Sequence, residues 1–143
     1  MGYKMRIFKI LSLVFFIMLF SVLFYSCSDE KQCISLINKY ISYSKAGRFD
    51  KIYENLLTGP AQQSFSRFAK ELASAQNSEQ YNIVIDTFKK IKRIKILAVE
   101  KFNDTEIAIK FQMIRKDEVI EDTPWWRFKK VDGKMKIMKF SKH

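Results

Sequence analysis

The chain has 143 residues, of which 48% are hydrophobic and 29% charged, with only four Gly and two Pro. This composition excludes a collagen-like, low-complexity or disordered chain. The formal net charge of +11 favours anionic partners, and it carries no information about the fold.

The N-terminal segment has the pattern of an export leader. Three basic residues, Lys4, Arg6 and Lys9, precede the mostly apolar stretch 10–25. As a helix, this stretch would reach about 24 Å, which is short of the roughly 30 Å hydrocarbon core of a bilayer. It is therefore interpreted as the apolar region of a secretory signal rather than as a full membrane span.

The leader ends in a lipidation motif. The run Leu23-Phe24-Tyr25-Ser26-Cys27 resembles the lipobox of bacterial lipoproteins, in which a small residue precedes the lipidated cysteine. The resemblance implies that residues 1–26 are removed as a signal peptide and that Cys27 carries the lipid. It also implies a location in the bacterial cell envelope, on a membrane leaflet that the sequence does not identify. An uncleaved signal anchor and a cleaved peptide without lipid remain alternatives.

Removal of residues 1–26 would leave 117 residues, a common size for one domain, with 23 basic and 15 acidic side chains and a net charge of +8. We expect a lipidated tether at 27–32 and a single α+β domain at 33–143. A chain of this length forms an apolar core without disulfides. With Cys27 lipidated, Cys33 has no intramolecular cysteine partner, and we expect it to be a small buried apolar side chain.

Apolar residues at helical spacing predict three helices in the first half of this domain. The first spans about Asp29 to Lys45, and its first residue forms a capping box with Gln32. Gly47 ends this helix, and a second, shorter helix begins near Asp50. A turn at Thr58-Gly59-Pro60 starts the third, because Pro is favoured at the first helical position.

The second half changes from helical spacing to alternation. Segment 79–91 has the spacing of a helix, although its centre, Ile83-Val84-Ile85, would also suit a strand. From Arg93 onward apolar residues alternate with polar ones, which predicts strands with one buried face. The clearest run places Ile107, Ile109, Phe111 and Met113 on the buried face, against Glu106, Lys110 and Gln112.

Turn signals separate the predicted strands. Asn103-Asp104 and Lys116-Asp117 are expected to close hairpins, and Asp132-Gly133 is the strongest type I′ signal in the chain. The last strand, 135–140, then pairs with 126–131. Helices followed by an antiparallel meander of about four strands predict an α+β fold, with the N-terminal helices packed on a curved sheet.

Two short motifs carry a family resemblance. Gly47-Arg48-Phe49-Asp50, and the stretch from Trp126 to Ile137, resemble the nuclear-transport-factor-2-like superfamily, and within it small bacterial lipoproteins with lumazine-binding-like domains of unknown function. The resemblance implies a cone-like cavity between helices and sheet that holds a small apolar ligand. It also implies a homodimer formed through the open sheet face.

The sequence offers little catalytic chemistry. Two Cys and one His give no cluster with metal-ligand spacing, and we expect no cofactor, no metal and no catalytic residue. The resemblance leaves one enzymatic alternative, a ketosteroid-isomerase-like enzyme, which needs an inward-facing carboxylate and Tyr or protonated Asp donors. Asp86 would supply such a carboxylate only if its side of the helix faced inward.

Aromatic residues are the candidate ligand contacts. Adjacent residues of a strand point to opposite faces, so one ring of Trp125-Trp126 is expected in the core and the other on the surface or in a groove. The candidate ligand-binding residues are Trp125, Trp126, Tyr53 and Phe111. We therefore expect a non-catalytic ligand- or partner-binding module.

Basic residues suggest a second kind of partner. They concentrate in the segment from Lys89 to Lys95 and near the C-terminus at Lys134, Lys136, Lys139 and Lys142. Export argues against nucleic acid, so a solvated surface and adhesion to anionic lipids or polysaccharides are the alternatives.

Overall fold

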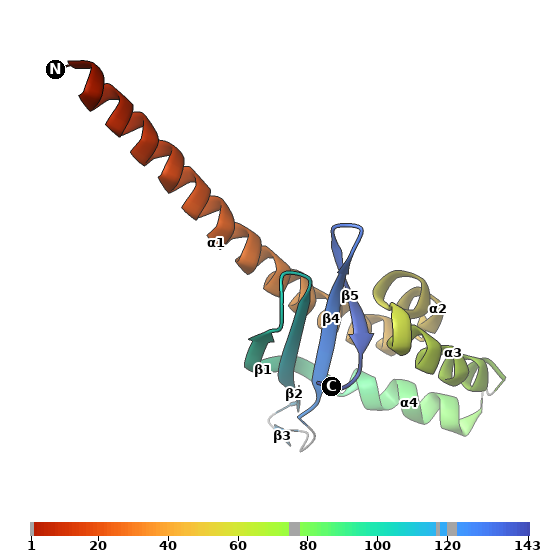
Figure 1. The fold of residues 1–143 in the computed structure, drawn as a ribbon. Coiled ribbons are helices and arrows are strands. Elements are labelled where there is room, and N and C mark those ends of the chain that lie inside the picture. Colours follow the sequence, from red (N-terminus) through yellow and green to blue (C-terminus); the bar gives the residue numbers. More distant parts are fainter. Residues whose placement is uncertain (1, 75–77, 117, 120–122) are drawn as a thin grey trace. The chain divides into compact units, whose positions relative to one another are not determined.

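Helices precede strands along the chain, as the sequence predicts (Figure 1). The computed structural model describes residues 2–74, 78–116, 118–119 and 123–143. By its contacts the chain divides into two units, Met1–Lys31 and Gln32–His143. The elements are α1 (Gly2–Lys45), α2 (Phe49–Lys51), the π-helix η1 (Ile52–Leu56), α3 (Gly59–Ser74), α4 (Glu79–Lys89), β1 (Ile91–Lys101), β2 (Glu106–Arg115), β3 (Glu118–Val119), β4 (Trp125–Val131) and β5 (Lys134–Lys139).

Helix α1 differs from the prediction at its start. It runs without interruption from Gly2, so the predicted capping box of Asp29 and Gln32 is wrong, because the backbone N–H groups there are already bonded within a continuous helix. The side chain of Gln32 instead accepts a hydrogen bond of 3.2 Å from the backbone N–H of Met135. Within the part of the chain that the structure describes, no helix combines the length and apolar character needed to cross a membrane.

Segment 79–91 resolves into helix α4 followed by the start of β1. Ser78 caps the helix by accepting a hydrogen bond of 3.2 Å from the backbone N–H of Tyr81. One side of α4 packs on the core through half-buried residues, while Ile83 on another side is 56% exposed. The helical period therefore prevails over the three consecutive β-branched residues at its centre.

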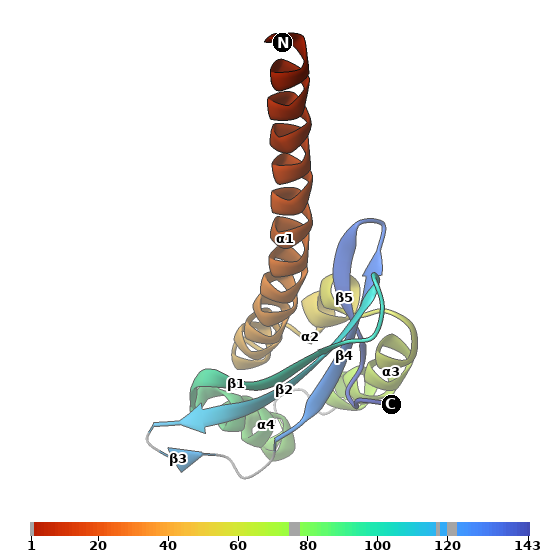
Figure 2. The ribbon, with the colours of Figure 1, turned by 60° about the vertical axis from the view of Figure 1, so that its left-hand side comes forward.

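The sheet is antiparallel, and its strands follow the order β1-β2-β4-β5, with the short β3 pairing the end of β2. Helices cover one face of it (Figure 2). On this inner face Ile107, Ile109 and Phe111 are buried and Met113 is half-buried, which confirms the predicted alternation on β2. The α+β class and the helix-on-sheet layout are thus those predicted. Cys33 is fully buried in the same core, as expected.

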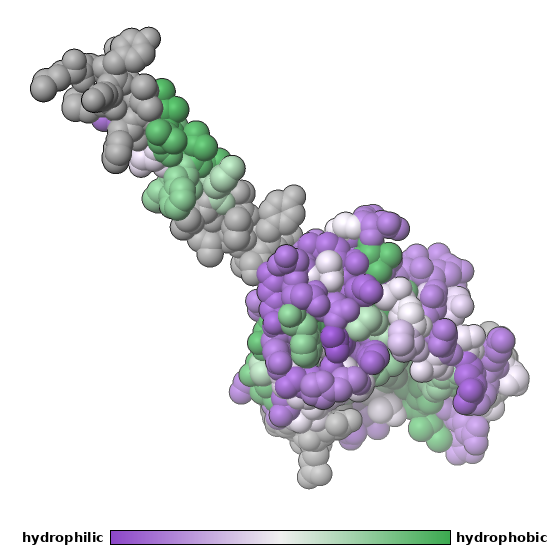
Figure 3. Space-filling model, viewed as in Figure 1, coloured by the Kyte–Doolittle hydropathy of each residue, from purple (hydrophilic) through white to green (hydrophobic). Residues whose placement is uncertain are grey.

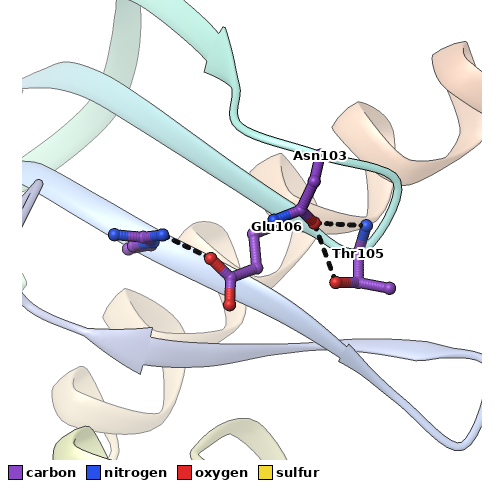
Figure 4. A network of polar contacts seen from close by, with 4 residues as sticks. Asn103, Thr105 and Glu106 are labelled. Atoms are coloured by element: carbon purple, nitrogen blue, oxygen red, sulfur yellow. Dashed lines mark hydrogen bonds and ion pairs between the residues drawn. The ribbon is translucent and has the colours of Figure 1, made fainter.

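Two predicted hairpin turns are confirmed. Between β1 and β2 the side-chain Oδ1 of Asn103 accepts hydrogen bonds of 2.9 Å from the backbone N–H and the hydroxyl of Thr105 (Figure 4). Between β4 and β5, Asp132 and Gly133 both have positive φ, 51° and 76°, as a type I′ turn requires. The turn predicted at Lys116-Asp117 lies partly outside the described residues.

The connection from η1 to α3 runs along the free edge of β5. Leu57 forms a parallel bridge with Ile137, and the backbone N–H of Thr58 donates to the Ile137 carbonyl at 2.9 Å. This short pairing occupies the middle of β5 on the side away from β4.

We predict that Phe111→Ala lowers the free energy of unfolding by about 3–5 kcal/mol, because it leaves a cavity in the core. Lys110→Ala, one residue away on the opposite face, serves as the control and is expected to be nearly neutral. Urea denaturation of both variants measures the difference. Similar losses from both would show that the strand register is wrong.

Candidate functional site

A pocket of about 440 Å³ opens among the helices of the Gln32–His143 unit, a volume in the range of small-molecule sites. Its walls come from the turn after α1, from α2 and η1, from α3, and from the first turn of α4. Apolar and aromatic side chains form most of the lining, with charged groups among them. The lining residues are Gly47, Phe49, Asp50, Tyr53, Glu54, Ser66, Ala69, Lys70, Leu72 and Tyr81.

The turn at Gly47 sets one wall of the pocket. Gly47 has a φ of 68°, and its N–H bonds to the Ser44 carbonyl at 3.2 Å while the Arg48 N–H bonds to the Tyr43 carbonyl at 2.8 Å. These two bonds form the Schellman motif that ends helices at a glycine. The chain therefore turns sharply out of α1 and places Phe49 and Asp50 at the pocket.

Close packing explains why this residue is glycine. A Cβ at Gly47 would lie 2.6 Å from the Tyr81 hydroxyl oxygen and 3.2 Å from Cδ1 of Ile85. Tyr81 is positioned in turn by the Ser78 cap at the start of α4. Its ring meets that of Phe49 edge-on, with centroids 6.2 Å apart. Absence of a side chain at Gly47 thus lets α4 approach the end of α1.

Phe49 anchors the floor of the pocket. Its ring is buried and packs against Phe65 and Phe68 of α3, with centroids 6.4 and 6.1 Å away. Phe65 also contacts Tyr40 of α1 at 6.1 Å, which connects the pocket to the core. Aromatic pairs of this geometry each contribute about 0.5–1.5 kcal/mol beyond their buried area. The floor is therefore a fixed part of the fold.

Charged groups surround the apolar floor. Arg48 donates to both carboxylate oxygens of Asp50, at 3.4 and 3.5 Å. This hydrogen bond is the main reason that the pKa of Asp50 lies below its usual value. Asp50 therefore stays ionised at neutral pH, and Glu54 and Lys70 add further ionisable groups to the lining.

The structure does not bring the four candidate ligand contacts together. Tyr53 lines the pocket and is 37% exposed. Phe111 and Trp126 meet edge-on in the core, with centroids 5.0 Å apart. Trp125 lies on the opposite face of the sheet, half-buried, with the Lys142 ammonium 4.7 Å from its ring centroid. The two Trp rings thus point to opposite faces, as the alternation predicted.

The sequence reasoning missed Tyr81, Ser66 and Lys70 as pocket residues. Nothing in their local sequence indicates a site, because they reach the pocket from two helices that tertiary packing brings beside α2. The motif Gly47-Arg48-Phe49-Asp50 was the available signal. Three of its residues line the pocket, and Arg48 pairs with the third of them, Asp50.

Aromatic rings pack between helices and sheet around Tyr40. Around Tyr40 lie Phe65, Phe88, Trp126 and Phe140, with centroids 4.9 to 6.1 Å away. Burial raises the pKa of Tyr40 to about 12, so its hydroxyl is neutral at physiological pH. Asp86, the acid considered for an isomerase-like site, is exposed on α4. Among the described side chains, no group of His, Cys, Asp and Glu has the arrangement of a metal site.

No family model and no curated protein matches this chain. Among solved structures it is similar to a de novo designed NTF2 fold protein, NT-9, at 11% sequence identity and a TM-score of 0.45. The similarity covers 76% of this chain and 83% of the design. The α+β class is established by the chain's own helices and antiparallel sheet.

We predict that Gly47→Ala destabilises the domain more than Gly133→Ala does. Both glycines have positive φ, which costs an L-residue roughly 1–2 kcal/mol, but a Cβ at Gly133 would meet no atom within 4 Å. The difference between their unfolding free energies therefore measures the contacts that a Cβ at Gly47 would make with Tyr81 and Ile85. Adding Tyr81→Phe to Gly47→Ala should recover part of the loss. Equal losses at both glycines, with no recovery, would show that Tyr81 does not lie against Gly47.

Proposed function

We propose that this chain is a lipid-anchored, non-catalytic binding protein of the bacterial cell envelope, and that it holds a small, partly apolar ligand in the pocket lined by Phe49, Tyr53 and Tyr81. The observation that carries the proposal is the aromatic floor of this pocket beneath charged side chains. Most small-molecule sites combine an apolar lining with a few polar groups that fix the orientation of the ligand.

The environment of the Asp50 carboxylate favours binding over catalysis. An isomerase-like site needs a base, or a protonated carboxylic acid, in apolar surroundings that raise its pKa. Asp50 has the opposite character, since Arg48 lowers its pKa and the carboxylate is exposed. A paired carboxylate of this kind is suited to orienting a ligand and is a weak proton acceptor.

The anchor is supported by the sequence of the leader. The basic residues, the short apolar stretch and the Ser26-Cys27 junction have the order found in exported lipoproteins. A single acyl chain holds a protein only marginally, at about 0.8 kcal/mol per buried methylene, so stable anchoring takes more than one chain. A multiply acylated Cys27 would keep the pocket at the membrane after the leader is removed.

Replacing Cys27 tests the anchor. Cells that express the chain are grown with an alkyne analogue of palmitate, and the purified protein is examined for the label. Wild type should be labelled and Cys27→Ser should not, whereas Cys33→Ser should keep the label. Equal labelling of wild type and Cys27→Ser would refute lipidation at this residue.

A filled pocket tests the ligand site. The neutral fluorescent probe N-phenyl-1-naphthylamine should bind the wild-type chain with enhanced emission. Ala69→Phe places a ring into the pocket and should weaken binding roughly tenfold or more, equivalent to at least about 1.4 kcal/mol. Gln63→Phe adds the same ring to the exposed side of α3 and serves as the control. The same affinity in both variants, or no binding by wild type, would contradict a site in this pocket.

A further inference from the structure

The strand register gathers basic residues from all four long strands on the outer face of the sheet. On β2 the inner positions are Ile107, Ile109 and Phe111, so Lys110 and Gln112 between them face outward. Their partners on β1 and β4 share that face, and β5 continues it. This basic sheet face comprises Arg93, Lys95, Lys110, Arg127, Lys129, Lys134 and Lys136.

The basic runs found in the sequence are joined by residues between them. Strands β1 and β5 carry the two lysine-rich segments and lie at opposite edges of the sheet. Without basic residues on the strands between them, these segments would form two separate surfaces. Lys110 on β2 and Lys129 on β4 fill the interval. Neighbouring strands are about 4.8 Å apart, and alternate residues of one strand about 6.8 Å, so the ammonium groups form a two-dimensional array.

Among the residues that the structure describes, the two glutamates of this face have local partners. Glu106 pairs with Arg127 (Figure 4), and Glu100 pairs with Lys142 at 2.7 Å. Lys129 and Lys136 stand directly opposite each other, a pairing of like charges that weakens a sheet. The Lys136 ammonium donates a hydrogen bond to the Asn55 carbonyl, which turns it away from Lys129. The remaining positive charge is thus available to an external anion.

The surface over the strands is mainly hydrophilic in the view of Figure 3. On the outer face Trp125, the first residue of β4, pairs with Lys110, and the Lys142 ammonium lies over its ring. Tryptophan is enriched at membrane–water interfaces, where its apolar ring and polar N–H are both accommodated. A broad cationic face with an amphipathic ring matches an extended anionic surface better than a small ligand. Its like charges would also oppose the homodimer that the family resemblance implies through this face.

We propose that the basic sheet face binds the phosphate headgroups of an anionic phospholipid bilayer. The two-dimensional spacing of the lysines fits a surface of headgroups, whereas a linear polyanion would engage a single row. The choice of a bilayer also rests on the proposed anchor, which would hold the domain near a membrane. Binding of this kind weakens with salt, since exposed charges are screened beyond about 8 Å at physiological ionic strength.

Fluorescence of Trp125 measures the contact. The full-length, non-acylated chain is added to preformed vesicles of phosphatidylglycerol or of phosphatidylcholine, and quenching by acrylamide is recorded. Trp126 is only 8% exposed, so the quenchable emission comes from Trp125, and Trp125→Phe verifies this assignment. On anionic vesicles the quenching constant should be roughly twofold lower than on neutral ones, because the bilayer covers the face around the ring, and 1 M salt should abolish the difference.

Charge variants assign the effect to this face. Lys95→Gln, Lys110→Gln and Lys129→Gln together should remove the protection of Trp125. The control combines Lys39→Gln, Lys89→Gln and Lys90→Gln, which remove the same charge from exposed positions in the helical layer. Circular dichroism checks that both triple variants fold, and the salt series on wild type gives a result that needs no variant.

Three outcomes would overturn the proposal. They are equal quenching on anionic and neutral vesicles, equal loss of protection in both triple variants, and protection by soluble heparin on neutral vesicles that matches the effect of anionic lipid. The last would assign the face to a polyanion. Because the chain in this assay carries no lipid, a negative result is independent of whether Cys27 is acylated.

Discussion

The two layers of the domain are joined through the ring of Tyr40. It contacts Phe65 of α3, Phe88 of α4, Trp126 of β4 and Phe140 just beyond β5, so one side chain of α1 connects three other helices and strands and the segment after the sheet. Phe65 extends this cluster to Phe49, which is the floor of the pocket. Hydrophobic contact and edge-on ring geometry act together here, because the rings pack against one another between the two layers around Tyr40. The pocket among the helices consequently has a rigid base, while its rim carries the charges.

Much of the fold follows from local pattern. Alternation on β2 identified the buried face because only one side of that strand meets the helices. The positive φ of Asp132 and Gly133 followed from the type I′ turn that joins two tightly paired strands. Ala108 and Ile114 are buried although they lie on the outer face of the same strand. Alternation does not predict this burial, because the burial depends on residues of neighbouring strands. Ala108, for example, is flanked by Glu100 of β1 and Arg127 of β4.

Less of the candidate site could be predicted. Gly47 could be placed as a helix stop from its type and position. Its contact with Tyr81 could not, because it joins the turn after α1 to α4, and α2, η1 and α3 lie between them in the chain. The same reason applies to the basic sheet face. The basic segments at its two edges could be found in the sequence. Lys110 and Lys129 could be assigned only to strands, and their position between those segments depends on the order of the strands in the sheet. Sequence patterns thus predicted the type and order of most elements, but not the surfaces that form between them.

The pairing of Leu57 with Ile137 gives the sheet two unlike edges. At β5 the connection to α3 occupies backbone groups in mid-strand, which blocks the addition of a strand from another chain. At β1 the protection is of another kind, since Lys92, Arg93 and Lys95 follow one another along the strand and repel a second copy. The β5 edge is therefore covered by a segment of the same chain, and the β1 edge is protected by positive charge. Acetylation of the β1 lysines would lower the barrier to fibrillar self-association at β1 alone, and the β5 edge would be unaffected.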